Sequence, residues 1–498
     1  MNAQQILSGL GWSTAATVVS AACQVVFMAV LARLLEPAAF GLMAMAAIAM
    51  RFAGYFSQLG FAQALIQRRE LEAKDTTAAL LMALALGSAL YVVMLGAAPL
   101  FAAAFQAPEL VRLIGVLGLS LLLGPIGSLP LALLRREARF KCVNAIEVLA
   151  YVLGFGGVGI GCAAAGLGVW SLVAATLSQQ AVVLAGGFAA LRYPLSWPVP
   201  RAAYARLWQF GSRYSLIGFV EFLGCNLDTM FVGRAFGKSE LGLFNRASTL
   251  TSLPVEFGVS AVNKVLFPAL AGMQHDRLRV ADGFQMLLLG IGLFSSALAC
   301  GIAGGAADVV ALLLGAKWAA IVPLVSVIAF AVPPTFAFVA CGVTLDSLAA
   351  LGPKLRLQSA MLVVKGVLVV ALARWGLAGV ACAVVATELL RVTLGMLLVG
   401  RLLGIPVAAL ARLLALFAAT GLAVWCAVAA ALAAAHAAAW PLGGRVALEA
   451  GAGAAAFAGI LLLLTWRWPR YAPLQRFETI RRWHGRLLAR MLPRESLR

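Results

Sequence analysis

Fourteen long apolar stretches, separated by short segments rich in Pro, Gly and charged residues, constrain this chain of 498 residues more than any motif does. Each stretch has about the 20 residues that an α-helix needs to cross the roughly 30 Å hydrocarbon layer of a bilayer. Apolar residues make up 63% of the chain and charged residues only 11%, whereas soluble domains average about 25% charged. The sequence therefore excludes a soluble enzyme, a secreted domain and a disordered chain, and it predicts a polytopic membrane protein.

We expect an all-α fold, because the stretches are rich in Ala and Leu and lack the alternating pattern of a transmembrane β-strand. The predicted spans are residues 9–32, 39–62, 77–100, 110–134, 146–166, 168–191, 212–236, 247–270, 282–305, 319–345, 355–374, 377–400, 413–435 and 445–466. Several prolines lie within or near them, and each predicts a bend. The tail at 467–498 alternates arginines with apolar residues at helical spacing, which predicts a basic amphipathic helix on the inner leaflet.

Lys and Arg are distributed unevenly over the connections between these spans. With the N-terminus placed inside, 27 of the 38 Lys and Arg residues fall on the cytoplasmic side and 7 on the other. Because positively charged loops stay in the cytoplasm, both termini are predicted to be cytoplasmic. The net charge of +19 is then a topology signal that also attracts anionic lipid headgroups. It is a poor indication of nucleic-acid binding.

Two similar segments indicate that the chain contains an internal duplication. ARLLEPAAFGLM at 32–43 resembles GRAFGKSELGLF at 233–244, with an offset of 201 residues. Chance similarity between stretches of like composition is the alternative. Six spans per copy give both copies the same orientation, and transporters with parallel repeats carry substrate between the halves. We expect two pseudo-symmetric six-helix lobes plus two extra helices, divided into an N-lobe at 1–192, a cytoplasmic linker at 193–211, a C-lobe at 212–402, spans 13 and 14 within 403–466, and the tail at 467–498.

Polar side chains inside the spans are the candidates for function, because a charge within the bilayer usually faces water or a partner. The first and seventh spans each carry a polar stripe on one helical face: Ser13, Thr17, Ser20 and Gln24 on the first, and Glu221, Cys225 and Asp228 on the seventh. Three further charged residues lie about half-way along their spans: Arg51, Glu256 and Lys365. Arg51 and Glu256 are expected to approach each other. A buried polar pair without a transport role is the alternative for each of these residues.

Several chemistries have no motif in the sequence. There is no GxxxxGK[ST] motif for ATP hydrolysis, and the eight cysteines and three histidines form no metal-ligand cluster. We therefore expect no catalytic residues, no metal and no cofactor, and we expect energy from H⁺, Na⁺ or the substrate gradient. Membrane carboxylates commonly carry such ions, which assigns ion coupling to Glu221, Asp228 and Glu256. Glu388 and Arg391 stand three residues apart and are expected to neutralise each other.

Two motifs stand out after the first and seventh spans: VLARLLEPAAFGLMAMA at 30–46 and NLDTMFVGRAFGKSELGLFNRAS at 226–248. Through these motifs the sequence resembles the polysaccharide-exporter branch of the multidrug/oligosaccharidyl-lipid/polysaccharide (MOP) flippase superfamily. The resemblance implies alternating-access flipping of an undecaprenyl-diphosphate-linked oligosaccharide across the bacterial cytoplasmic (inner) membrane, for O-antigen, exopolysaccharide or capsule assembly. It also implies a cleft lined mainly by spans one, two, seven and eight. The implied partners are the lipid-linked substrate, membrane lipids and other polysaccharide-assembly proteins.

A pyrophosphate inside the membrane needs a positively charged partner. Arg51 and Lys365 are the candidates, and Ser20 and Gln24 complete the expected substrate-binding set. A multidrug/cation antiporter of the same superfamily is one alternative, although its cleft should be acidic and aromatic. A membrane-embedded glycosyltransferase or polymerase is another, although it should show a large outer loop or an acidic motif at a span end.

Overall fold

The computed structural model describes residues 3–57, 72–191, 196–197, 222–252, 276–348 and 350–467. Every regular element in these ranges is a helix. Nine helices among them are long and apolar enough to cross a membrane, or ten with one bent pair. The described residues of all fourteen predicted spans are mostly helical, with turns such as those at 118–119, 165–166 and 330–331. The predicted all-α polytopic fold is therefore confirmed, whereas the predicted tail and linker lie almost wholly outside the described residues.

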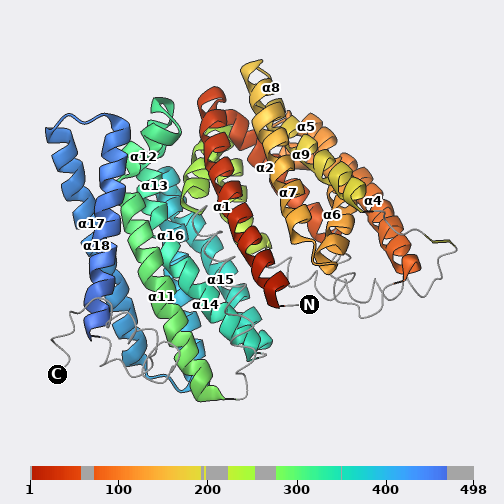
Figure 1. Cartoon of the computed structure of the whole chain (residues 1–498). Coiled ribbons are helices and arrows are strands. Elements are labelled where there is room, and N and C mark those ends of the chain that lie inside the picture. Colours follow the sequence, from red (N-terminus) through yellow and green to blue (C-terminus); the bar gives the residue numbers. More distant parts are fainter. Residues whose placement is uncertain are drawn as a thin grey trace. The chain divides into compact units, whose positions relative to one another are not determined.

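Two compact units make up the chain. The first is Met1–Arg246 with Leu313–Trp318, and the second is Ala247–Leu312 with Ala319–Arg498. Helices of the first unit (Figure 1) are α1 (Ala3–Leu34), α2 (Pro37–Ser57), α4 (Ala73–Phe105), α5 (Leu110–Leu117), α6 (Ser120–Arg136), α7 (Phe140–Tyr151), the π-helical η1 (Val152–Gly159), α8 (Ile160–Ala164) and α9 (Val169–Ala190), followed by most of the helical segment 222–252.

In the first unit, the C-terminal end of α1 receives side chains from the segment Leu313–Trp318. The Trp318 indole Nε1 donates a hydrogen bond to the Ala32 carbonyl at 2.9 Å. The Lys317 Nζ donates to the carbonyls of Leu35 at 2.7 Å and Arg33 at 3.0 Å. Because the last carbonyls of a helix have no partner within the helix, these two side chains cap α1 from a segment almost 300 residues away.

The remaining described helices belong to the second unit, except for the residues within Leu313–Trp318, which belong to the first. They are α11 (Arg277–Gly304), α12 (Ala306–Leu313), the 3₁₀ helix η2 (Ala316–Ile321), α13 (Val322–Ala329), α14 (Val332–Ser347), α15 (Leu351–Leu372), the 3₁₀ turn η3 (Ala373–Trp375), α16 (Gly376–Leu403), α17 (Val407–Ala437) and α18 (Leu442–Arg467). A bend of 40° separates Ala316–Ala329 from Val332–Ser347. Proline stands in the first turn of α13 and of α14, so the expected bend occurs where proline cannot continue a helix.

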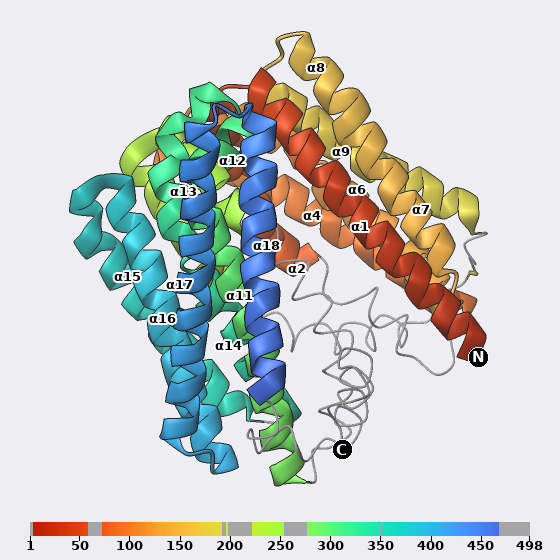
Figure 2. The ribbon, with the colours of Figure 1, turned by 60° about the vertical axis from the view of Figure 1, so that its left-hand side comes forward.

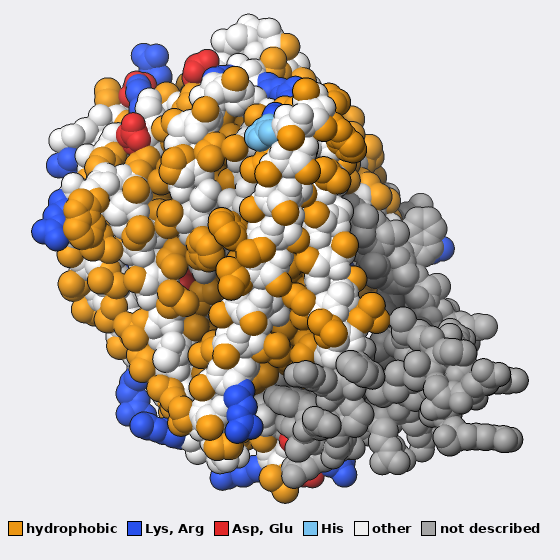
Figure 3. Space-filling view, turned by 90° about the vertical axis from the view of Figure 1, so that its left-hand side faces the viewer, with side chains coloured by type: hydrophobic (Ala, Val, Ile, Leu, Met, Phe, Trp, Pro, Cys, Tyr) orange, Lys and Arg blue, Asp and Glu red, His pale blue; other side chains and the backbone are white. Residues whose placement is uncertain are grey.

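A single apolar core joins four helices of the second unit. Its large members include Phe284 on α11, Phe336 on α14, Met396 on α16 and Phe417 on α17. Helices α15 and α16 form a hairpin at the edge of this core, as Figure 2 shows. The face in Figure 3, to which α17 and α18 contribute, is covered by hydrophobic side chains over its middle, with Lys and Arg toward its ends. That distribution is typical of helices in contact with lipid.

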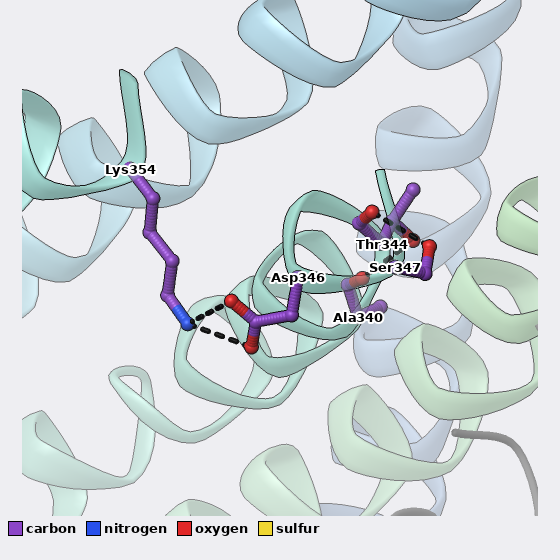
Figure 4. A network of polar contacts seen from close by, with 5 residues as sticks. All are labelled: Ala340, Thr344, Asp346, Ser347 and Lys354. Carbon is purple, nitrogen blue, oxygen red and sulfur yellow. Dashed lines mark hydrogen bonds and ion pairs between the residues drawn. The ribbon is translucent and has the colours of Figure 1, made fainter. Parts of the chain in front are cut away.

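An ion pair fixes the turn between α14 and α15. The Lys354 Nζ lies 2.8 Å from both carboxylate oxygens of Asp346 (Figure 4). The nearby hydroxyls of Thr344 and Ser347 donate to carbonyls of their own helix and therefore leave the carboxylate to the lysine. The pair lies at a predicted cytoplasmic connection, where charged groups remain within reach of water.

Candidate functional site

Arg51 on α2 contacts the helical segment 222–252 within the first unit. Its Nη1 donates to the Asn226 Oδ1 at 3.4 Å. Asn226 is buried, and its Nδ2 donates in turn to the Phe222 carbonyl at 2.8 Å. The rings of Phe52 and Phe222 pack beside this contact with centroids 6.1 Å apart. The guanidinium of Arg51, itself on an exposed side chain, is therefore oriented by a buried amide.

The predicted polar stripes are described only in part. Ser20 and Gln24 are half-buried on α1. Asp228 is buried, and its Oδ1 accepts a hydrogen bond from the Thr229 backbone N–H at 3.0 Å. Glu221 and Glu256 lie outside the described residues, as do the side chains of Ser13 and Thr17. The roles assigned to the stripes, and the approach of Arg51 to Glu256, stay predictions.

Lys365 belongs to the second unit, where it lies on α15 about half-way along its span. Only 7% of this lysine is exposed, so the structure buries it within the protein. Its proposed contact with substrate stays a prediction.

Arg246 is another arginine of the first unit. Unlike Arg51, it was not among the site residues predicted from the sequence. Its guanidinium carbon lies 4.2 Å from the centroid of the Phe40 ring. Its Nη2 donates to the Asn245 Oδ1 at 3.3 Å, while its buried Nε has no hydrogen-bond partner among the described residues. It also lies close enough to Tyr151 for electrostatic interaction. The signal was present in the sequence, because Arg246 is the last arginine of the motif at 226–248.

Aromatic rings line the same part of the first unit. Tyr151 at the end of α7 stacks on Phe155 of η1 at 4.9 Å and on Phe27 of α1 at 5.8 Å. Phe27 lies on the helix that carries Ser20 and Gln24. The structure therefore brings α1, α7 and η1 together around three aromatic rings, with Arg246 close to Tyr151.

Glu388 and Arg391 on α16 contact each other and the helix α14. They form an ion pair, and Glu388 Oε2 also accepts a hydrogen bond from the Thr335 hydroxyl at 3.2 Å. Arg391 additionally lies over the Phe338 ring at 4.2 Å. The prediction that these two residues neutralise each other is confirmed. Within the described residues, no group of three His, Cys, Asp or Glu side chains is placed to hold a metal ion.

The helices, their length and their buried polar contacts define a polytopic α-helical membrane protein. Residues 30–323, more than half of the chain, match the family model described as "Polysaccharide biosynthesis protein". The chain belongs to this family, and the predicted membership in the polysaccharide-exporter branch is confirmed.

Two curated proteins and one solved structure illustrate the similarity. The lipopolysaccharide biosynthesis protein WzxC of Escherichia coli (strain K12) is 27% identical over 331 residues, covering 65% of this chain and 66% of WzxC. The teichuronic acid biosynthesis protein TuaB of Bacillus subtilis (strain 168) is 26% identical over 341 residues, covering 66% and 68%. The chain thus matches about two thirds of the length of these relatives.

The fold is also that of a solved structure, the lipid II flippase MurJ in an inward closed conformation. The TM-score is 0.73 at 11% identity, covering 93% of this chain and all of that one. At this identity the likeness shows the fold alone. The prediction that the chain is not an enzyme agrees with the family and the curated relatives.

Proposed function

We propose that this protein is a flippase that moves an undecaprenyl-diphosphate-linked oligosaccharide from the inner to the outer leaflet of the bacterial cytoplasmic membrane. In this proposal it works by alternating access, is coupled to H⁺ or Na⁺, keeps both termini in the cytoplasm and serves O-antigen, exopolysaccharide or capsule assembly. Other polysaccharide-assembly proteins would supply and consume the lipid-linked substrate.

One observation carries the proposal. Arg51 and Arg246, two arginines within or beside membrane spans, hydrogen-bond to asparagine side chains, which are neutral. Arg391, by contrast, is paired with a carboxylate. An amide orients a guanidinium without cancelling its charge, and among the described residues neither Arg51 nor Arg246 forms an ion pair with a carboxylate, so both guanidinium groups are candidates to bind an anion. A diphosphate is the anion that a guanidinium binds most readily, because two N–H groups match two phosphate oxygens.

The aromatic rings support the sugar part of the substrate. The stack of Phe27, Tyr151 and Phe155 lies near Arg246, and flat apolar ring faces pack well against the C–H faces of sugars. Ser20 and Gln24 precede Phe27 on α1, at spacings that put the three residues on one face of the helix. Their side chains would offer hydrogen bonds to sugar hydroxyls. WzxC, TuaB and MurJ are named for lipopolysaccharide biosynthesis, teichuronic acid biosynthesis and lipid II flipping, respectively, which is consistent with this substrate class.

The direct test uses the full-length protein in proteoliposomes that contain a labelled undecaprenyl-diphosphate-linked oligosaccharide. A membrane-impermeant glycosidase or lectin reports how fast the label changes leaflet. We expect the wild type to accelerate the exchange and Arg51→Ala or Arg246→Ala to slow it by about tenfold or more, because a hydrogen bond to a charged group contributes about 1.5–3 kcal/mol.

Arg374→Ala is the matched control, since Arg374 is exposed and lies over Trp375 at the end of α15. Wild-type rates in both test variants would remove the assigned arginines. A wild type that exports a cationic dye from the same vesicles and leaves the oligosaccharide in place would instead support the antiporter.

A further inference from the structure

Three charged side chains that the proposed transport site does not use meet in the second unit. Asp308 lies in the first turn of α12, and Arg445 and Glu449 lie four residues apart at the start of α18, on one helical face. Glu449 and Asp308 are 3% and 6% exposed. Such burial is unusual on α18, because only 6% of its span is buried inside the protein.

The cluster contains two carboxyl groups and one cation. The Arg445 Nε lies 3.2 Å from the Asp308 Oδ2. Glu449 lies beside Asp308. Both Glu449 oxygens are buried without a hydrogen-bond partner among the described residues, and the same is true of the Asp308 Oδ2 and the Arg445 Nε. If both carboxyl groups were ionised, the buried cluster would carry a net charge of −1.

One bound proton would cancel this net negative charge. An ionised carboxylate has only acceptors, so two carboxylates hydrogen-bond to each other only when one of them is protonated. Asp308 is the group stabilised as an anion, because it faces the Arg445 guanidinium and lies at the positive end of α12. The proton therefore belongs on Glu449, the carboxyl group that lacks a cation of its own.

The backbone beside the cluster leaves room for Glu449. A Cβ atom on Gly305 would lie only 2.5 Å from the Glu449 Oε2, so glycine at the end of α11 lets the carboxyl group enter. With Arg445 beside Asp308, the cluster with both carboxyl groups ionised carries a net charge of −1, which one proton balances and a divalent metal cation would exceed. The geometry favours a proton over a metal ion.

The other titratable groups on the helices packed against α18 belong to α17 and α11. Those of α17 are exposed: Arg412, Cys426 and His436. Those of α11 are Cys300, which is one turn before Gly305, and Arg277, Arg279 and Asp282 at the opposite end of that helix. Among the described residues, Arg445 is thus the charge that faces the pair.

We propose that Asp308 and Glu449 form a proton-binding site, in which Glu449 carries an exchangeable proton that it donates to the Asp308 carboxylate. The site belongs to the second unit, between spans 9 and 10 and on span 14, whereas Asp228 belongs to the first unit. It rests on the proposed function in one respect, because a proton-coupled flippase would use this site to take up protons from the outer side of the membrane.

The test is infrared difference spectroscopy on the full-length protein in lipid nanodiscs across a pH titration, which detects the C=O band of protonated carboxyl groups. We expect a band in the wild type that disappears at high pH and is absent in Glu449→Gln. Asp308→Asn should also lose it, because Glu449 then ionises beside Arg445. Glu388→Gln is the matched control and should keep the band, since Glu388 is paired with Arg391.

Three results would overturn the site. The first two are an unchanged band in Glu449→Gln and a band lost equally in Glu388→Gln. The third is a wild-type band that NaCl abolishes and choline chloride does not at the same pH, which would indicate that the site binds Na⁺. A melting curve of each variant shows that it is folded, and Glu449→Gln should melt with the wild type because glutamine mimics the neutral acid. None of these readouts requires flipping, so a failure of the proposed function leaves the test valid.

Discussion

Gly41 and Gly242 pack against each other's helices in a reciprocal arrangement. A Cβ atom on Gly41 would overlap the Lys238 carbonyl oxygen, and a Cβ atom on Gly242 would overlap the Pro37 carbonyl oxygen. Gly41 and Gly242 are 201 residues apart, as are Pro37 and Lys238. The same two repeat positions therefore supply both halves of the contact, as a local two-fold axis requires. This contact supports the duplication inferred from the sequence.

We predict that Gly41→Ala and Gly242→Ala each destabilise the protein by about 1–3 kcal/mol or more, since a methyl group has no space beside a carbonyl oxygen. The double variant should cost less than the sum of the two, because the first methyl group already separates the helices. Thermal unfolding in detergent measures both effects. Gly54→Ala is the control, because Gly54 lies on α2 with open space around its Cβ position. Equal melting temperatures of Gly41→Ala and Gly54→Ala would contradict the close contact at Gly41.

A second prediction concerns Arg51 and Asp228 in the living cell. Arg51→Ala and Asp228→Ala should abolish surface polysaccharide while membrane abundance stays unchanged, because the exposed guanidinium and the buried carboxylate are assigned to substrate and ion rather than to folding. Arg51→Lys should retain part of the function, since lysine keeps the charge and loses the paired N–H groups. Immunoblots of membranes alongside polysaccharide gels measure both quantities, and normal polysaccharide in both alanine variants would remove the assignment.

The sequence predicted the helices and local pairs well because both depend on neighbouring residues. Apolar length set the spans, and the three-residue spacing of Glu388 and Arg391 was enough to predict their ion pair. The contact between Arg51 and Asn226 joins residues 175 apart, and no local pattern specifies which of several polar residues on the seventh span it meets. Asp308 and Glu449 were unpredictable for the same reason, since each looks like an ordinary charge at the end of a span until α12 and α18 pack together.

The ion pair of Glu109 and Lys238 predicts a pH dependence. The Lys238 Nζ lies 2.6 Å from the Glu109 Oε1, outside the spans, and this hydrogen bond lowers the pKa of Glu109. A carboxylate with a lowered pKa stabilises the folded state above its ordinary pKa, and that contribution disappears as the pH falls through the lowered value. The melting temperature of the wild type should therefore exceed that of Glu109→Gln at neutral pH and converge with it in acid.

High salt should shrink the same difference at neutral pH, because the pair is about half-exposed and its charges are screened. A difference between wild type and Glu109→Gln that stays constant from neutral to acid pH would show that the pair does not form.

The cap on α1 gives the last prediction. Trp318 is fully buried, its indole donates to the Ala32 carbonyl, and its ring packs edge-on against Phe40 with centroids 5.6 Å apart. Trp318→Phe keeps an aromatic ring beside Phe40 but leaves a buried carbonyl without a donor, which costs about 1–3 kcal/mol. Trp425→Phe, on an exposed part of α17, should cost far less.

Hydrogen exchange locates the effect of losing the cap. Amides from Met28 to Phe40 should exchange faster in Trp318→Phe than in the wild type, because the last turn of α1 opens more readily once its carbonyls lose their partners. Lys317→Met should act on the same amides, since Lys317 donates to the carbonyls of Arg33 and Leu35. Faster exchange spread evenly over α1 and α17 would instead mean that the tryptophan serves the general packing of the protein and that the capping bond contributes little.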